Sequence, residues 1–343
     1  MRPRVNTVAA WIVAAALHAP FPIAASAQSP VADQESEDRW VASLAVTSGV
    51  MLQGQDGKTD ACLFANPANV TTDCPAPGST PLRPPSSAND LAIVAFVGPN
   101  LELMTPALPI PTRPRFFVSG EILPTFSADR DLSSEGDPTC VSGTAPDSPC
   151  ARDVGPGNLP TNAFGQDDAL GQGSVVTTTY DTLSFGANLG LAFPVQVGKR
   201  RLRIKPSVGW ISYEVKVEGK VVDAACQPPN QCTNVRNVAQ PGLLRETILD
   251  ANDTKRFHAI GPGVDIEMDT GRFGPLGTAI FVGGHAYRTL GDRTVEIATS
   301  QVYGNDGLPL ANQAVSARWS AEFKPWLFRA GVGLRIQWLG GTK

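Results

Sequence analysis

The sequence lacks any apolar run long enough to cross a membrane as a helix. Such a helix needs about 20 consecutive apolar residues, whereas the runs Val8 to Leu17 and Leu91 to Val97 are much shorter. Charged residues are also few, at 17% of the chain, while glycine and proline number 33 and 30. Because glycine and proline disfavour long helices, the composition excludes a helical membrane protein and favours a chain built from β-strands.

Histidine and basic clusters are scarce as well. Beyond the N-terminal segment the only histidines are His258 and His285, and no GxSxG nucleophile motif lies near them. The formal net charge is −4 and no basic patch is present, which excludes nucleic-acid binding. We therefore expect no enzyme, no cofactor and no metal site, and a lipid-modifying enzyme is the weakest of the functional alternatives.

The N-terminus has the features of a secretory signal. Arg2 and Arg4 precede the short apolar run, and Ala25-Ser26-Ala27 provides the small-x-small pattern of a cleavage site. The sequence predicts a signal peptide over residues 1–27, a linker over 28–38 and a β-barrel over 39–343. Export places the mature chain in an oxidising compartment.

The six cysteines form three close pairs in the sequence. Six cysteines allow many connectivities, but each pair lies inside its own polar, proline-rich segment, which favours local disulfides. None of the pairs has a CxxC core or a nearby histidine, so zinc is disfavoured. The predicted pairs are Cys62 with Cys74, Cys140 with Cys150, and Cys226 with Cys232.

Apolar residues at every second position indicate strands throughout the chain. The clearest block runs from Trp326 to Trp338, with every second residue apolar, and is long enough, when tilted, to cover a hydrocarbon core of about 30 Å. Strands of soluble sheets average only about five or six residues. Seven similar blocks lie at 40–52, 91–103, 116–122, 183–193, 202–210, 260–268 and from Ile280 onward.

The connections between these blocks alternate in length. Long polar segments at 53–89, 127–173 and 222–253 alternate with short ones at 105–114, 195–200 and 270–277, and a medium loop spans 300–313. Bacterial barrels distribute surface loops and periplasmic turns in this way. We predict an all-β fold: an eight-stranded antiparallel up-and-down transmembrane β-barrel with long extracellular loops. Three prolines inside the blocks, Pro99, Pro206 and Pro262, count against regular ladders, and a soluble exported β-sandwich is the competing fold.

These patterns resemble the small outer-membrane barrels of Gram-negative bacteria, the OmpA-type membrane domains and the OmpX- and OmpW-type proteins. Gly333, Ile336 and Trp338 match the C-terminal assembly signal of those proteins, although Gly331 stands where a polar residue is usual and the chain continues past Trp338. The resemblance implies an outer-membrane location, contact with outer-membrane lipid and lipopolysaccharide, and recognition by the barrel-assembly machinery.

An eight-stranded barrel has an interior filled by side chains. The strand phase predicts an inward charge network in which three bases face three acids across adjacent strands. Its members are Arg201, Arg203, Lys205, Asp265, Glu267, Asp269, Glu121 and Arg335. We expect this network to close and stiffen the barrel, so the leading function is a structural or surface-interaction role through disulfide-stapled loops, toward an unknown extracellular partner. The alternative is a narrow channel or transporter gated by the same pairs.

The longest connecting segment is strongly acidic. It carries eight acids, among them Asp129 and Asp168, against two bases, Arg130 and Arg152. A solvated loop explains this composition, and a site for a cation or a basic partner is the sharper alternative.

Overall fold

The computed structural model describes residues 39–81, 86–126, 130–136, 173–180, 183–198, 200–226, 244–303 and 313–339. No helix in these segments is long and apolar enough to span a membrane. One short 3-10 turn (Pro67–Asn69) accompanies twelve antiparallel strands. The strands are β1 (Val41–Phe64), β2 (Ser79–Pro81), β3 (Ser86–Met104), β4 (Arg115–Phe126), β5 (Arg130–Gly136), β6 (Gly173–Tyr180), β7 (Leu183–Val197), β8 (Arg200–Cys226), β9 (Leu244–Phe273), β10 (Leu276–Thr289), β11 (Thr294–Tyr303) and β12 (Gln313–Trp338).

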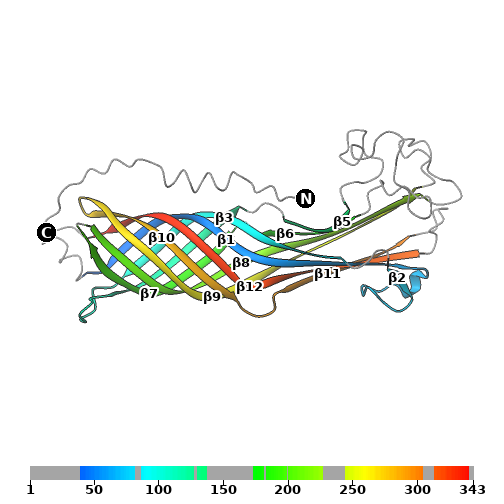
Figure 1. Cartoon of the computed structure of the whole chain (residues 1–343), viewed down its shortest axis with the longest axis horizontal. Coiled ribbons are helices and arrows are strands. Elements are labelled where there is room, and N and C mark those ends of the chain that lie inside the picture. Colours follow the sequence, from blue (N-terminus) through cyan, green and yellow to red (C-terminus); the bar gives the residue numbers. More distant parts are fainter. Residues whose placement is uncertain are drawn as a thin grey trace, which may run out of the picture.

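Eight of these strands close into a barrel. Around the ring the order is β1, β3, β4, β7, β8, β9, β10 and β12, and β12 pairs with β1 from Ala42↔Trp338 to Phe64↔Ala314. Each neighbour in the ring is also the next ring strand in the sequence, which is the up-and-down topology (Figure 1). The predicted fold class is confirmed, and each of the eight predicted blocks lies on one ring strand.

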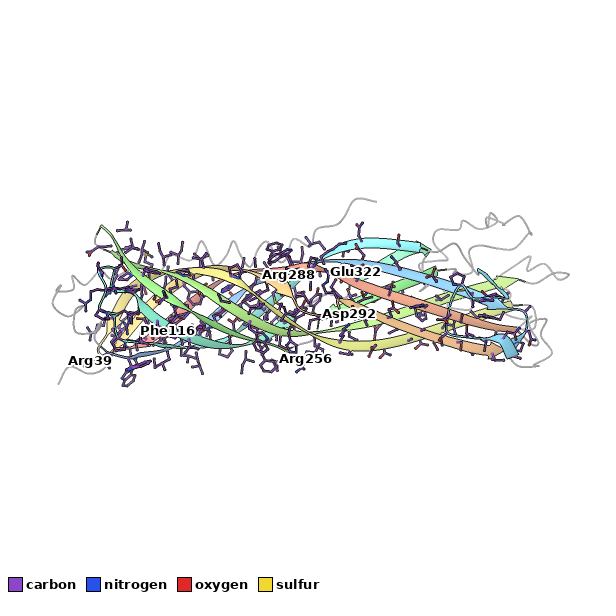
Figure 2. The ribbon with its side chains drawn as sticks, turned by 90° about the horizontal axis from the view of Figure 1, so that it is seen from below. Arg39, Phe116, Arg256, Arg288, Asp292 and Glu322 are labelled. Carbon is purple, nitrogen blue, oxygen red and sulfur yellow. A yellow bond between two sulfur atoms is a disulfide. The ribbon has the colours of Figure 1, made fainter. Side chains whose placement is uncertain are left out.

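The outer surface of this ring is an apolar belt. Side chains alternate between the two faces of a strand, and on every ring strand the outward positions are exposed aliphatic or aromatic residues. One representative per strand is Val46, Leu101, Val118, Leu189, Val208, Ile266, Val282 and Leu334, each at least 45% exposed. Figure 2 shows these crowded outward side chains over the half of the molecule that contains Phe116.

The strands extend far beyond the belt. β8 has 27 residues and β9 has 30, so at about 3.3 Å per residue β9 extends roughly 100 Å. Crossing a hydrocarbon core takes only about 9–11 residues. The predicted long loops at 53–89, 127–173 and 222–253 and the medium loop at 300–313 are therefore shorter than expected, because their ends continue the strands or form β2, β5, β6 and β11.

We call the part beyond the belt the extension. It consists of β1 from Gln55, β3 up to Asp90, β8 from Ser212, β9 up to Phe257 and β12 up to Phe323, together with β2, β5, β6 and β11. Its strands form two sheets, one with β11, β12, β1 and β3 and one with β5, β6, β8 and β9. Among the described residues no ladder joins β9 to β11 or β3 to β5. Figure 1 shows the β8–β9 arm diverging from β11 and β12 toward the tip.

The positions of apolar residues invert where the barrel becomes the extension. On β8 the last belt residue, Trp210, points outward, and the next residue, Ile211, points inward and is fully buried. Beyond it the inward side chains are apolar, such as Val217, while the outward ones are charged, such as Lys216. The extension thus has its own apolar core and a polar outer surface, as a sheet pair in water requires.

The three prolines noted within the sequence blocks each occupy a gap in one ladder. Pro99, Pro206 and Pro262 point outward and keep a pairing partner on one side. On the other side pairing is missing at 97–99 between β3 and β4, at 205–206 between β7 and β8, and at 261–262 between β9 and β10. Proline has no N–H to donate to a ladder, so each gap lies where that donor would be needed.

The first cysteine pair attaches a loop to the outside of the extension. Cys62 and Cys74 form a disulfide across 12 residues, which confirms the local pairing predicted for this pair. Cys62 and Phe64 point outward from β1 but are fully buried, because the β1–β2 connection covers them and Ala314. Cys226 ends β8, while Cys140, Cys150 and Cys232 lie outside the described residues.

Candidate functional site

The interior of the barrel contains buried charged side chains near the end at which β12 terminates. Arg203 on β8 lies opposite Glu267 on β9, with 2.8 Å between Nη2 and Oε1, and also contacts Asp269. On the same two strands Lys205 lies opposite Asp265. Charges buried this deeply are tolerated only when they are paired.

Further ion pairs in this layer cross the lumen. Lys205 contacts Glu102 on β3, and Arg335 on β12 contacts both Glu102 and Glu267. The side chains of these residues are at most 2% exposed. Because β3, β8, β9 and β12 are spread around the ring, the network joins opposite walls. We call these groups, with Arg203 and Asp269, the lower charge layer.

A second layer of charged side chains lies a few residues further along the strands, on the side of the extension. Arg329 on β12 forms a bidentate pair with Glu121 on β4, and Asn100 lies 3.5 Å from the same carboxylate. Ser207 and His285 lie 3.4 Å apart across β8 and β10. In each layer a cation also lies over an aromatic ring, Arg329 over Phe96 at 4.6 Å and Arg335 over Phe281 at 4.9 Å.

The two charged layers enclose a cavity of about 20 Å³. Thr47, Asn100, Asp265 and His285 are among its lining residues. The Oγ1 atom of Thr47 and the Oδ1 atom of Asn100 are buried and have no hydrogen-bond partner among the described residues. A cavity needs on the order of 10–15 Å³ to hold a water molecule, so this space fits about one water and no larger solute.

Between the charged layers and the extension lies a layer of uncharged side chains joined by hydrogen bonds. We call it the neutral layer. Tyr180 and Tyr213 both donate to Oε1 of Gln53 at 3.0 Å, and Gln53 donates to Thr289. Thr178 donates to Gln55 at 2.8 Å. These groups come from β1, β6, β8 and β10, so this layer also connects distant walls.

The neutral layer leads directly into the apolar core of the extension. The rings of Tyr213 and Phe257 are 5.6 Å apart, those of Phe257 and Phe323 are 5.1 Å apart, and Trp319 is fully buried beyond them. The lumen is thus filled in sequence by charged, neutral polar and apolar side chains along its length.

Large side chains pack over inward-facing glycines throughout this interior. A Cβ at Gly209 would lie 3.0 Å from the ring of Tyr287, and one at Gly219 would lie 2.3 Å from the ring of Trp319. A Cβ at Gly333 would lie 2.4 Å from Phe281. Glycine is required at these positions because the neighbouring ring occupies the space of its missing side chain.

The remaining predicted residues are placed as follows. Asp265 points into the cavity beside Gly283. Arg201 is half-buried at the start of β8. Gly333, Ile336 and Trp338 lie on β12, which closes the ring against β1. His258 lies outside the barrel, stacked on Trp210 at 5.8 Å, whereas His285 lies in the lumen.

Sequence reasoning missed the neutral layer and the apolar core. Gln53 fell in a segment interpreted as a loop, and Trp319 fell between the loop at 300–313 and the block that begins at Trp326, so the inward direction of neither was considered. The signal was present, because Val315, Ala317, Trp319, Ala321 and Phe323 alternate with polar residues. These apolar positions are odd-numbered, whereas those from Trp326 onward are even-numbered. The period-2 pattern therefore changes phase between the two runs and does not predict one continuous strand.

Comparison with known proteins gives only distant likenesses. No protein-family model and no curated protein sequence match the chain. The InvG secretin domain β-barrel of the Salmonella SPI-1 injectisome has 9% identity and a TM-score of 0.13, covering 86% of this chain and 61% of that one. The chain therefore spans under two thirds of that secretin domain.

Two further structures are similarly distant. A Pseudomonas aeruginosa FadL homologue has 9% identity and a TM-score of 0.17, covering 87% of this chain and 90% of that one. The Ralstonia pickettii toluene transporter TbuX has 9% identity and a TM-score of 0.16, covering 84% and 88%. These identities and TM-scores are too low to assign a function.

Proposed function

We propose that this protein is an integral outer-membrane β-barrel with a filled lumen, whose structural or surface-interaction role is exerted through the extension and the loops beyond it. The observation that carries the proposal is the pairing of an apolar outer belt with an interior of buried ion pairs. A soluble barrel has its apolar side chains inside, and the ring here has them outside. A bilayer is the environment in which that arrangement is stable.

The filling of the lumen supports a structural role over transport. The charged layers cross the barrel, the cavity between them holds about one water, and the apolar core closes the lumen beyond the neutral layer. A diffusion pore needs a much wider barrel of about 16 strands. An ion path would require several of these contacts to separate together.

The extension supports a role outside the bilayer. Its outward residues are polar or charged, such as Glu214, Lys216 and Glu296, so it is suited to water. It holds the strand ends, and the connections between them, tens of ångströms from the belt. We propose that this arrangement presents the loops to a partner beyond the cell surface and that the protein is not an enzyme.

Membrane insertion and sidedness are tested with single cysteines. Ser300→Cys lies on the exposed face of β11, and Pro275→Cys lies in the turn at the opposite end of the barrel. A membrane-impermeant maleimide is expected to label Ser300→Cys in intact cells and Pro275→Cys only after the outer membrane is permeabilised. Equal labelling of both sites in intact cells, or recovery of the protein in a detergent-free soluble fraction, would refute the proposal.

Conductance distinguishes the structural role from the narrow channel. The refolded protein, verified by a heat-dependent shift in gel mobility, is added to planar lipid bilayers. We expect no steps above the baseline. The polar cavity beside Asp265 is the feature that favours a channel, so steps whose cation selectivity is lost in Asp265→Asn, with Asp250→Asn as the exposed control, would establish that alternative.

A further inference from the structure

One exposed arginine lies among aromatic residues at the upper border of the belt. Arg288 on β10 points outward, and its direct cross-strand neighbours are Ile260 on β9 and Trp326 on β12. Trp210 on β8 lies opposite Ile260 in turn. The last belt row over these four strands is therefore Trp210, Ile260, Arg288 and Trp326, a single cation flanked by apolar residues.

Three other cations at this border are already paired with carboxylates. Arg256 contacts Glu214 at 2.9 Å, Lys255 contacts Asp292 at 2.7 Å, and Lys324 contacts Asp56. The hydrogen bond from Lys255 also holds the pKa of the Asp292 carboxyl below its usual range. The carboxylates of Glu214, Asp292 and Asp56 thus have partners of their own. Figure 2 shows Arg256, Arg288, Asp292 and Glu322 together at the junction of belt and extension.

Arg288 and Arg293 differ from these residues. Among the described residues neither guanidinium has a carboxylate within ion-pair distance. Arg293 lies in the turn between β10 and β11, where its carbonyl accepts the backbone N–H of Phe323. The backbone of Arg293 therefore lies beside Phe323 on β12, three residues from Trp326, the cross-strand neighbour of Arg288.

We propose that Arg288 and Arg293 bind the phosphate of a phosphorylated lipid headgroup whose acyl chains lie along the belt below Trp326. Guanidinium groups bind phosphate through bidentate hydrogen bonds. Tryptophan is enriched at the headgroup level of a bilayer, and the apolar residues below, such as Phe328 and Val282, are exposed to receive acyl chains. This inference rests on the proposed function, because the headgroup must lie at the level of the junction.

The test uses the protein folded in non-ionic detergent, titrated with three probes. Short-chain phosphatidic acid carries both phosphate and chains, the matching diacylglycerol lacks phosphate, and inorganic phosphate lacks chains. Binding is followed by tryptophan fluorescence and by mass spectrometry of lipid retained after gel filtration. We expect phosphatidic acid to bind at least tenfold more tightly than either other probe.

The double variant Arg288→Gln/Arg293→Gln is expected to lose about tenfold in affinity for phosphatidic acid. Arg318→Gln removes a partly exposed charge from the extension, where Arg318 pairs with Glu296, and should bind as the wild type does. Unchanged binding in the double variant, an equal loss in Arg318→Gln, or equal binding of inorganic phosphate would overturn the inference. All variants are first checked for the heat-dependent gel shift.

The two proposals can be refuted independently of each other. If the protein does not enter the outer membrane, the cysteine-labelling experiment fails whatever the lipid titration gives. If it enters the membrane but binds phosphatidic acid and diacylglycerol equally, the barrel proposal stands and the headgroup site is rejected.

Discussion

Lys205 on β8 and Glu102 on β3 form an ion pair although two strands of the ring, β7 and β4, separate their own strands. The contact therefore crosses the lumen and does not follow a ladder. Both side chains are at most 2% exposed, and Lys205 also lies 4.5 Å from the ring of Phe117. This pair connects separate walls of the barrel, so the lower charge layer fills the lumen and closes it.

Removing the cation of this pair should strongly destabilise the barrel. Lys205→Met leaves the carboxylates of Glu102 and Glu267 with one cation fewer in a buried site, and losing one partner of a buried pair costs about 3–5 kcal/mol. The control is Lys216→Met, which breaks the exposed pair with Glu218 and should cost less than about 1 kcal/mol. Denaturant unfolding followed by the gel shift measures both. Equal stability of the two variants would contradict a plug held by buried charge.

Glycines beneath aromatic rings should not tolerate a methyl group. In Gly219→Ala the new Cβ would lie 2.3 Å from a ring atom of Trp319, and overpacking of this kind costs about 1–3 kcal/mol. Gly120→Ala is the matched control, because nothing lies within 4 Å of its Cβ. Thermal unfolding followed by near-ultraviolet circular dichroism compares them. A Gly219→Ala protein as stable as the control would show that Trp319 does not pack as described.

The core of the extension should depend on Trp319. Trp319→Ala removes a fully buried side chain and should cost about 3–5 kcal/mol. Trp319→Phe should cost much less, because it keeps an aromatic ring and removes an indole N–H that has no partner among the described residues. Limited proteolysis should cleave the extension first in Trp319→Ala while the belt region stays protected. If Trp319→Phe is as damaging as Trp319→Ala, that account of the unpartnered N–H fails.

The first disulfide should hold its loop against the extension. Without the crosslink in Cys62→Ser/Cys74→Ser, the loop covering Phe64 is held by a small apolar cluster and by the short β1–β2 ladder. Protease cleavage between residues 65 and 78 should then become much faster, with a loss of stability of about 2–4 kcal/mol at most. Mass mapping of the fragments measures the cleavage site. Unaltered protection would mean that the apolar cluster and the β1–β2 ladder fix the loop without the disulfide.

The sequence by itself determined the ring. The even-numbered apolar positions from Trp326 to Trp338 specify one strand, its outward face and its inward glycines and arginines, because side chains alternate strictly along a strand. The same alternation predicted that the bases of β8 face the acids of β9 across adjacent strands, and the ladder pairs Arg203 with Glu267.

Only the tertiary structure decided the extension and the contacts across the lumen. Trp210 and Ile211 are adjacent apolar residues, and the sequence does not say that one ends the belt and the other begins a core, because which face is buried depends on what surrounds the strand. Likewise, the pairing of Lys205 with Glu102 required the ring to close. Local pattern fixes the direction of each side chain, whereas closure in three dimensions fixes which distant side chain it meets.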